Sequence, residues 1–408
     1  MDETKNDNYS NIEPNETNEP NKTNEPNEMI NSFDKMNLKT NLLRGIYNYG
    51  FEKPAQIQSK TMPYIIAGKD LIAQSQSGTG KTGAFAIGTI QRIDDTVKGC
   101  QACILAHTRE LAQQIYEVCK NLSTYTNITC VLCIGGQDIR QTKTELNKGA
   151  VITIGTPGRI IDLIKKGFLS TRLLQLLVID EADEMLSYSF QDQIKTIIKY
   201  LPNTTQICLF SATLPNQVLE LTKRFMRDPV NILLEPEKLT LEGIKQFYIN
   251  VDTELWKFET FCDIYDIISV SQTIVYVNTI KRGEDLKKQL EEKHFTVSLI
   301  HSDMAIDERI KVMKEFRSGS SRILISTDLL ARGIDVQQIS IVINYDFPRN
   351  KNFKESYLHR IGRSGRFGKK GIAINLITKY DMNGLNELKD FYKTNIEAMP
   401  DNIQTYLS

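Results

Sequence analysis

The sequence lacks the features that would place it in a membrane or in a secretory pathway. Its 408 residues contain no run of about 18 or more apolar residues, so a transmembrane helix is excluded. The first residues, MDETKNDNYSNIEPNETNEPN, have no apolar core, so we expect no secretory signal. Triplets of the Asn-x-Ser/Thr type, such as the one at Asn15, are therefore expected to carry no glycan.

The chain also lacks net charge and an even set of cysteines. Its 50 Lys and Arg residues balance 50 Asp and Glu residues, so any binding of nucleic acid must come from a local site. Seven cysteines without an export signal are expected to be reduced thiols. Two CxxC pairs, at 100–103 and 130–133, have a spacing typical of zinc sites. The second pair lies in a predicted strand, where residues three apart point to opposite faces, so zinc is disfavoured.

Residues 1–30 form a segment of biased composition. Glu-Pro-Asn recurs with a six-residue period around Pro14, Pro20 and Pro26. A polar repeat of this kind cannot bury enough apolar surface to offset the loss of chain entropy, so we expect a disordered tail. Lys5 and Lys22 are its only basic residues, which argues against an RNA-binding tail.

The remainder of the chain, from Phe33 on, predicts two α/β domains. Short runs rich in Ile, Val and Leu occur at 102–106, 130–134, 151–154, 176–180 and 207–210, and again at 273–277, 297–300, 322–326, 340–344 and 372–377. Continuous apolar runs that alternate with helical patterns are typical of parallel strands buried on both faces. We therefore expect an N-terminal domain at 31–235, a linker at 236–245 and a C-terminal domain at 246–408.

A glycine-rich turn marks a candidate phosphate site. The residues from Gly78 to Thr82 spell GTGKT, follow the apolar run 70–74 and precede a predicted helix. This arrangement is the phosphate loop, in which backbone N–H groups and the helix N-terminus surround the phosphates. Lys81 is expected to reach the β- and γ-phosphates, and the hydroxyl of Thr82 to hold Mg²⁺. A glycine turn without a ligand is the disfavoured alternative.

A carboxylate pair follows a later strand of the same domain. Asp180 and Glu181 end the run 176–180. We expect Asp180 to bind Mg²⁺ and Glu181 to orient or deprotonate the attacking water. The pair could also be a simple helix N-cap, but the GTGKT turn in the same domain weakens that interpretation.

The letters around this pair point to a known family. Residues 180–183 spell DEAD, and from Phe33 to its C-terminus the chain resembles the DEAD-box RNA helicases. The motifs occur in the order found in that family: GFEKPAQIQ (50–58), SQSGTGKT (75–82), HTRELAQQ (107–114), GG (135–136), TPGR (156–159), SAT (211–213), IVYVNT (274–279), STDLLARGID (326–335) and HRIGRSGR (359–366). One short motif would be weak evidence, whereas this many in order is strong evidence.

The resemblance implies two RecA-like domains, each a parallel sheet flanked by helices, that use ATP and Mg²⁺. It implies catalytic roles for Lys81, Asp180, Glu181, Arg363 and Arg366, the two arginines reaching the γ-phosphate from the second domain. Nucleotide binding is implied for Phe51, Gln58, Ser77, Gly78, Thr79, Gly80, Lys81, Thr82, Gly333 and Asp335. Contacts to RNA are implied for Arg109, Gly136, Thr156, Arg159, Thr327 and Asp328. Coupling between nucleotide and RNA is implied for Asp183, Ser211, Thr213 and His359.

Within the family, the sequence is most similar to the translation initiation factor 4A subfamily and to its nuclear paralogue in the exon-junction complex. Segments such as LLRGIYNYGFEKP and STDLLARGIDVQQ carry this likeness. The resemblance implies a monomer that acts in translation initiation in the cytoplasm, with the nucleus as the alternative location. It also implies an RNA substrate and a helical-repeat scaffold of the initiation-factor 4G type as a partner.

Two other functions fit part of this pattern. An ATP-gated RNA clamp, held closed by partners, would carry the same motifs as a helicase, so sequence hardly separates the two. A phosphate-loop ATPase acting on a small molecule would leave the ordered motifs of the second domain unexplained, and is disfavoured.

Overall fold

The computed structural model describes residues 31–76, 78–233, 243–268, 272–328, 339–364, 371–400 and 403. The predicted tail and most of the predicted linker lie outside these residues. So do four of the predicted site residues: Ser77, Gly333, Asp335 and Arg366.

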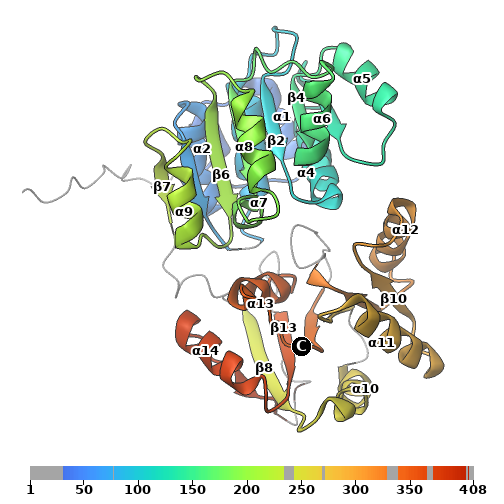
Figure 1. Ribbon diagram of the computed structural model, residues 1–408. Coiled ribbons are helices and arrows are strands. Elements are labelled where there is room, and N and C mark those ends of the chain that lie inside the picture. Colours follow the sequence, from blue (N-terminus) through green and yellow to red (C-terminus); the bar gives the residue numbers. More distant parts are fainter. Residues whose placement is uncertain are drawn as a thin grey trace, which may run out of the picture.

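The first half of the chain forms a seven-stranded parallel sheet with the order β3-β4-β2-β5-β6-β1-β7. Its strands are β1 (Leu71–Gln74), β2 (Ala102–Leu105), β3 (Cys130–Cys133), β4 (Ile152–Gly155), β5 (Leu176–Asp180), β6 (Gln206–Ser211) and β7 (Val230–Ile232). A 3-10 helix, η1 (Phe33–Met36), precedes the helices α1 (Thr40–Asn48), α2 (Gln56–Ile66), α3 (Lys81–Arg92), α4 (Arg109–Leu122), α5 (Ile139–Asn147), α6 (Pro157–Lys165), α7 (Ala182–Met185), α8 (Gln191–Lys199) and α9 (Asn216–Thr222). This half is coloured blue to green in Figure 1.

The second half forms another seven-stranded parallel sheet, with the order β10-β11-β9-β12-β13-β8-β14. Its strands are β8 (Ile244–Asn250), β9 (Thr273–Tyr276), β10 (Val297–Ile300), β11 (Ile323–Ser326), β12 (Ile341–Asn344), β13 (Gly371–Ile377) and β14 (Glu397–Ala398). The 3-10 helix η3 (Glu254–Trp256) leads into α10 (Lys257–Ile268), and α11 (Ile280–Glu292), α12 (Ile306–Arg317), α13 (Phe353–Ile361) and α14 (Met382–Tyr392) follow.

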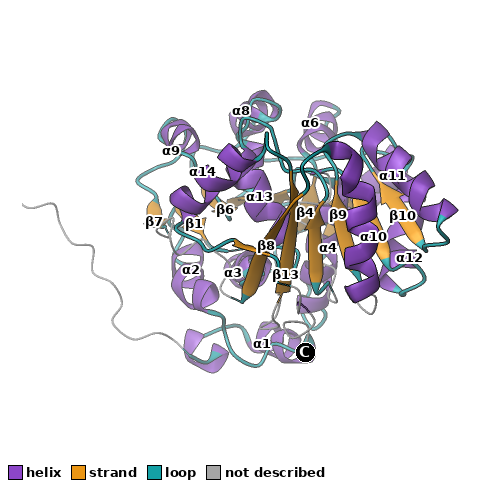
Figure 2. Ribbon diagram, turned by 90° about the horizontal axis from the view of Figure 1, so that it is seen from below, coloured by secondary structure: helices purple, strands orange, loops and turns teal. Residues whose placement is uncertain are grey.

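Helices lie on both sides of the strands, so each sheet is buried on both faces (Figure 2). Along β6, Cys208 and Phe210 pack into the core on one face, whereas Ile207 and Leu209 pack into a separate core on the other. All strands of the inner part of both sheets are fully buried, as their continuous apolar runs predict. The predicted fold class, two RecA-like parallel sheets flanked by helices, is confirmed.

The strands that the apolar runs did not reveal lie at one side of each sheet. β7 and β8 contain exposed or half-exposed positions, and in β8 Lys245 is exposed between two buried residues. Such strands do not fit the pattern of a continuous apolar run. β8 begins at Ile244, within the stretch 236–245 that the sequence suggested as a linker.

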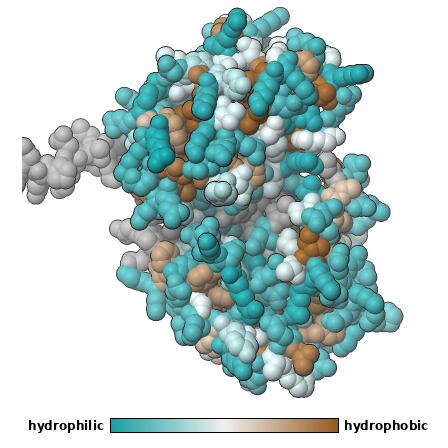
Figure 3. All heavy atoms as spheres, viewed as in Figure 1, coloured by the Kyte–Doolittle hydropathy of each residue, from teal (hydrophilic) through white to brown (hydrophobic). Residues whose placement is uncertain are grey.

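The two halves contact each other through their loops and helices. The ion pair between Arg309 on α12 and Glu110 on α4 measures 3.0 Å, and His359 on α13 lies 3.0 Å from Asp183 on α7. Apolar residues on the visible face are scattered among hydrophilic ones rather than gathered into one large patch (Figure 3). Within the described ranges, no helix is long and apolar enough to cross a membrane.

Candidate active site

The phosphate loop connects β1 to α3. Gly78 and Gly80 have φ angles of 78° and 98°, in the left-handed region that favours glycine. Lys81, the first residue of α3, is buried, and its ammonium group donates hydrogen bonds to the carbonyl oxygens of Ser75 (2.7 Å) and Gln76 (2.8 Å). The loop therefore holds a buried cation beside a helix N-terminus, which is a setting suited to binding phosphate.

Phe51 and Gln58 pack against the start of α3. The backbone N–H of Ala55 donates to the side-chain oxygen of Gln58 (2.8 Å), and the Gln58 amide donates to the carbonyl oxygen of Gly80 (3.3 Å). A Cβ atom at Gly83 would lie 2.5 Å from that amide nitrogen and 3.3 Å from the Phe51 ring. The absence of a side chain at Gly83 thus allows the two predicted base-binding residues to approach the phosphate loop.

Asp180 and Glu181 lie at the carboxyl end of β5 and are both buried. Burial, together with the charge of Glu181, raises the pKa of Asp180 to about 7, although the charge of Lys81 acts in the opposite direction. The positive charge of Lys81 is therefore not enough to offset burial and the adjacent carboxylate. Carboxylate oxygens are hard ligands, which suit Mg²⁺. Thr82, the other predicted Mg²⁺ ligand, is the second residue of α3.

The backbone at Glu181 is unusual. Its φ is 49° and its ψ is 54°, the left-handed conformation, which costs a non-glycine residue roughly 1–2 kcal/mol. Its N–H donates to the carboxylate of Asp180 (2.9 Å). The turn aims two adjacent carboxylates into one site, which a regular strand could not do because successive side chains point to opposite faces.

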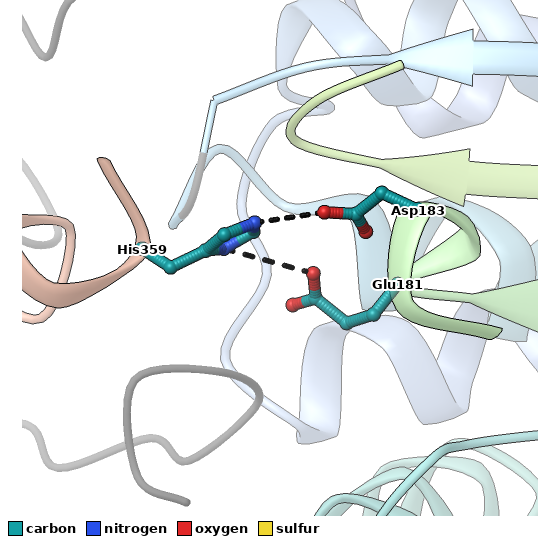
Figure 4. A group of neighbouring side chains, drawn as sticks. All are labelled: Glu181, Asp183 and His359. Atoms are coloured by element: carbon teal, nitrogen blue, oxygen red, sulfur yellow. Dashed lines mark hydrogen bonds and ion pairs between the residues drawn. The ribbon is translucent and has the colours of Figure 1, made fainter. Parts of the chain in front are cut away.

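Asp183 joins the two halves of the molecule. Its carboxylate accepts hydrogen bonds from the hydroxyls of Ser211 and Thr213, each 2.7 Å long, and lies 3.0 Å from Nε2 of His359. Nδ1 of the same imidazole lies 3.9 Å from the carboxylate of Glu181 (Figure 4). The structure thus brings together all four residues predicted to couple nucleotide and RNA, and places them beside Glu181.

His359 and Arg363 lie one helical turn apart at the end of α13. Arg363 is buried and its Nε donates to the carbonyl oxygen of His359 (3.3 Å). Between them, the fully buried Arg360 donates to the carboxylate of Asp328 (2.6 Å) and to the side-chain oxygen of Asn278 (3.0 Å). Asp328 was predicted to contact RNA, and its carboxylate is here engaged by Arg360.

The residues predicted to contact RNA in the first half gather at one edge of its sheet. They follow the adjacent strands β3, β4 and β2: Gly136 in the turn before α5, Thr156 and Arg159 at the start of α6, and Arg109 at the start of α4. Arg159 donates to the carbonyl oxygen of Gln137 (3.0 Å). Helix N-termini and arginines are suited to nucleic-acid phosphates. In the second half, Thr327 follows β11 and is half-buried.

Sequence reasoning missed two features of the interface. The pair of Glu110 and Arg309 connects the halves, and Arg309 is buried although it lies on a helix with many charged residues. No spacing in the sequence signals a contact between such distant residues. Arg360 stands within the motif HRIGRSGR, but only its neighbours were assigned roles.

The cysteines do not form a metal site in the part of the chain that the structure describes. All seven are free, and burial raises the pKa of the thiols of Cys100, Cys103, Cys130 and Cys133. Among the described residues, the single group of three or more closely spaced potential ligands consists of Glu181, Asp183 and His359.

Comparison with protein families finds two matches. Residues 55–221 match the DEAD/DEAH box helicase family, and residues 256–368 match the helicase conserved C-terminal domain. Among curated relatives, "ATP-dependent RNA helicase eIF4A" of Chaetomium globosum is 53% identical over 92% of this chain and 94% of its own length. The protein of the same name from Schizosaccharomyces pombe is also 53% identical, over 92% of this chain and 95% of its own.

Solved structures add information on how the halves are arranged. Saccharomyces cerevisiae Dbp5 bound to RNA and ADP BeF3 superposes with a TM-score of 0.86 at 34% identity, covering 92% of this chain and 97% of that one. A DEAD box protein from Methanococcus jannaschii is 36% identical, covering 91% of this chain and 99% of that one, yet its TM-score is 0.53. Since the identities and coverage are similar, the higher TM-score shows that the whole chain superposes better on the Dbp5 structure than on the archaeal one.

Proposed function

Because the chain belongs to the DEAD/DEAH box helicase family, we propose that it is an ATP-dependent RNA helicase whose two domains close around ATP and RNA. The observation that carries this proposal is the contact of His359 with Asp183 beside Glu181. This contact exists only when α13 of the second domain meets the carboxylates of the first. Closure would therefore complete the catalytic site.

The first domain would bind the nucleotide. The loop from Gly78 to Gly80 and the ammonium group of Lys81 would hold the phosphates, while Phe51 and Gln58 would hold the adenine. Thr82 and Asp180 would be the residues that hold Mg²⁺. When bound, that ion would neutralise charge on the phosphate oxygens.

Glu181 would orient the attacking water and accept its proton. Its position next to Asp180 and its left-handed backbone aim its carboxylate toward His359. The second domain would supply Arg363 and Arg366 to stabilise the charge that develops on the γ-phosphate. Gly333 and Asp335, which also belong to the second domain, would contact the nucleotide.

RNA would bind along the backbone-contacting residues of both domains. Arg109, Gly136, Thr156 and Arg159 would provide a narrow track at the carboxyl ends of β2, β3 and β4, and Thr327 and Asp328 would continue it on the second domain. Contacts to phosphate and 2′-OH groups give little sequence preference. A chain with no net charge fits a narrow track better than a large basic surface.

The 53% identity to eIF4A proteins favours a role in translation initiation. Such a role would place the protein in the cytoplasm, with a helical-repeat scaffold of the initiation-factor 4G type as a partner. The alternative, an RNA clamp in mRNA processing, would use the same closed arrangement but would release phosphate slowly on RNA.

The test compares ATP hydrolysis and duplex unwinding by the full chain with single-stranded RNA, with DNA of the same sequence, and with neither. We expect strong stimulation by RNA and little by DNA, because the 2′-OH is the chemical difference that a backbone reader can sense. Replacing Glu181 by Gln should block hydrolysis and trap the protein on RNA in ATP. Equal stimulation by DNA, or rapid release of the Glu181→Gln protein from RNA, would contradict the proposal.

A further inference from the structure

A pair of asparagines lies in the otherwise apolar centre of the second sheet. Asn344 ends β12 and is paired in register with Asn375 on β13, and both side chains are fully buried. The amide of Asn344 donates to the side-chain oxygen of Asn375 (2.8 Å). Buried amides cost free energy unless they are hydrogen-bonded, and Ile or Val would serve packing alone at these positions. The pair therefore has a use other than filling the core.

The hydrogen bonds continue from this pair toward β8. The amide of Asn375 donates to the carbonyl oxygen of Phe247 (2.9 Å) and to the hydroxyl of Tyr357 (3.3 Å). That hydroxyl donates to the side-chain oxygen of Gln246 (2.9 Å), whose amide in turn donates to the hydroxyl of Thr394 (3.1 Å). Networks in which every member is bonded make a core rigid and specific, whereas a half-satisfied network is costly.

In the other direction, the network reaches Arg360, the residue that follows His359 on α13. Nη1 of Arg360 donates to the side-chain oxygen of Asn344 (3.4 Å) and to the carbonyl oxygen of Asp346 (2.8 Å). The same guanidinium group holds Asp328 and Asn278. Arg360 and Tyr357 both belong to α13, so the network is hydrogen-bonded to this helix at two residues, three positions apart.

Tyr357 lies on the opposite side of α13 from His359, whereas Arg360 is about 100° from His359 around the helix axis. At 100° per residue, His359 is about 200° from Tyr357 around the helix axis, and Arg363 lies two residues beyond the end of the helix, with its Nε donating to the carbonyl oxygen of His359. α13 lies on the side of the second domain that faces the first (Figure 1), and His359 points from it toward the two carboxylates (Figure 4). On one face of the helix, Tyr357 is thus hydrogen-bonded to residues of the sheet. On another face, His359 points toward the ATP site.

Apolar packing alone would leave the rotation of this helix loosely defined. Leu358 and Ile361 bury apolar side chains on the same domain, but the hydrophobic effect has no direction. A side-chain tip about 6 Å from a helix axis moves about 2 Å when the helix turns by about 20°. Catalytic groups lose much of their effect when they are misplaced by about 1 Å. Directional hydrogen bonds from Tyr357 and Arg360 prevent such a turn.

We propose that Tyr357, Asn375 and Asn344 are positioning residues for ATP hydrolysis, because they set the rotation of α13 and so the placement of His359 and Arg363. They act through these residues and do not touch the nucleotide themselves. The inference rests on the proposed function, since it concerns the same ATPase site. It assigns a use to three core residues that lie outside the helicase motifs.

The test replaces Tyr357 by Phe in the full chain, which removes the hydroxyl from the centre of the network and keeps the ring. RNA-stimulated kcat should fall about tenfold while KM for ATP stays within about twofold, because the first domain carries the phosphate loop. The matched control is Tyr345→Phe, since Tyr345 is also a buried tyrosine of the second domain and its hydroxyl has no hydrogen bond among the described residues. This control should keep wild-type kcat.

A second arm separates positioning from simple loss of stability. In the background of His359→Ala combined with Arg363→Ala, adding Tyr357→Phe should lower kcat by no more than about twofold further, because both groups being positioned are gone. If Tyr357→Phe lowers only the Tm, or if its loss of kcat multiplies with that of the variant lacking both His359 and Arg363, the positioning role is wrong. If Tyr357→Phe does not fold, Gln246→Leu removes the acceptor of the same hydroxyl and should give the same kcat pattern. A wild-type chain without RNA-stimulated ATPase would refute the proposed function instead.

Discussion

The two halves of the molecule have the same strand order but opposite chemistry at their facing ends. If the strands of each half are numbered from its first strand, both sheets read 3-4-2-5-6-1-7. β5 of the first half ends in the carboxylates of Asp180 and Glu181, whereas its counterpart β12 leads to α13 with His359, Arg360 and Arg363. One scaffold therefore supplies acidic groups in one half and basic groups in the other, and the two sets complement each other when the halves meet.

The halves also differ in how their functional groups are held. In the first half, Lys81 is bonded to Ser75 and Gln76, which are six and five residues away in sequence. In the second half, Arg360 is held by Asn278, 82 residues away, and by Asp328, 32 residues away. In the first half, Lys81 is held in place by residues of its own loop. In the second half, Arg360 is held in place by residues that are distant in sequence. Substitutions in the two halves should therefore have different signatures.

The largest expected effect comes from the second half. Arg363→Ala should lower RNA-stimulated ATPase by about 10³-fold or more, the range seen for arginines that reach a transferred phosphate. ATP affinity measured without RNA should remain close to wild type, because the phosphate loop is untouched. Steady-state ATPase and nucleotide titration would measure both. If ATP affinity falls together with ATPase, Arg363 contributes to nucleotide binding, and the proposed difference between the halves is wrong.

A matched change in the first half should lose both properties. Lys81→Ala removes the buried ammonium group beside the phosphate loop, and ATPase should fall by about 10²–10³-fold together with ATP affinity. The same two assays apply, with Lys39→Ala as a control at a lysine whose ammonium group bonds to carbonyl oxygens at the far end of α3. Wild-type turnover in Lys81→Ala would refute the assignment of the phosphate loop.

The contact between the halves should have a smaller effect. His359→Ala removes a hydrogen bond to the charged Asp183, which is worth about 1.5–3 kcal/mol, so ATP-dependent RNA affinity should weaken by about 10–100-fold. RNA affinity without ATP should change little. Arg309→Ala breaks the other ion pair between the halves and provides a comparison. If His359→Ala leaves ATP-dependent RNA affinity at the wild-type level, the contact does not stabilise closure.

The smallest expected effect concerns stability and pH. The folded chain raises the pKa of Asp180 from 3.8 to about 7, so it keeps a proton that the unfolded chain releases between these values. Stability without nucleotide should therefore fall as pH rises from about 4 to 7. Asp180→Asn removes this penalty and should raise the Tm at pH 8 but not at pH 4. Thermal unfolding of the variant and of the wild-type chain at both pH values measures this effect. If the two proteins have the same Tm at pH 8, the prediction is wrong.

The central strands could be predicted because each is a continuous apolar run, and a run of that kind is stable only between two layers of helices. The phosphate loop and the carboxylate pair could be predicted because their spacing is local and the chemistry needs those residue types. Strand β8 could not, because its polar residues Lys245 and Gln246 interrupt the pattern. Gln246 is hydrogen-bonded to Tyr357 and Thr394, which are distant in sequence, and this explains why a polar residue stands at this buried position.

By itself, the sequence determined the two parallel α/β units, the family and the identity of the groups that bind nucleotide, since each depends on composition or short spacing. The tertiary structure alone decided which of these groups meet. Asp183 contacts His359 across 176 residues of chain, and Glu110 pairs with Arg309. It also raised the pKa of Asp180 and placed the asparagine pair behind α13. Burial and contact between distant segments depend on how the whole chain packs, and no local pattern of residues encodes them.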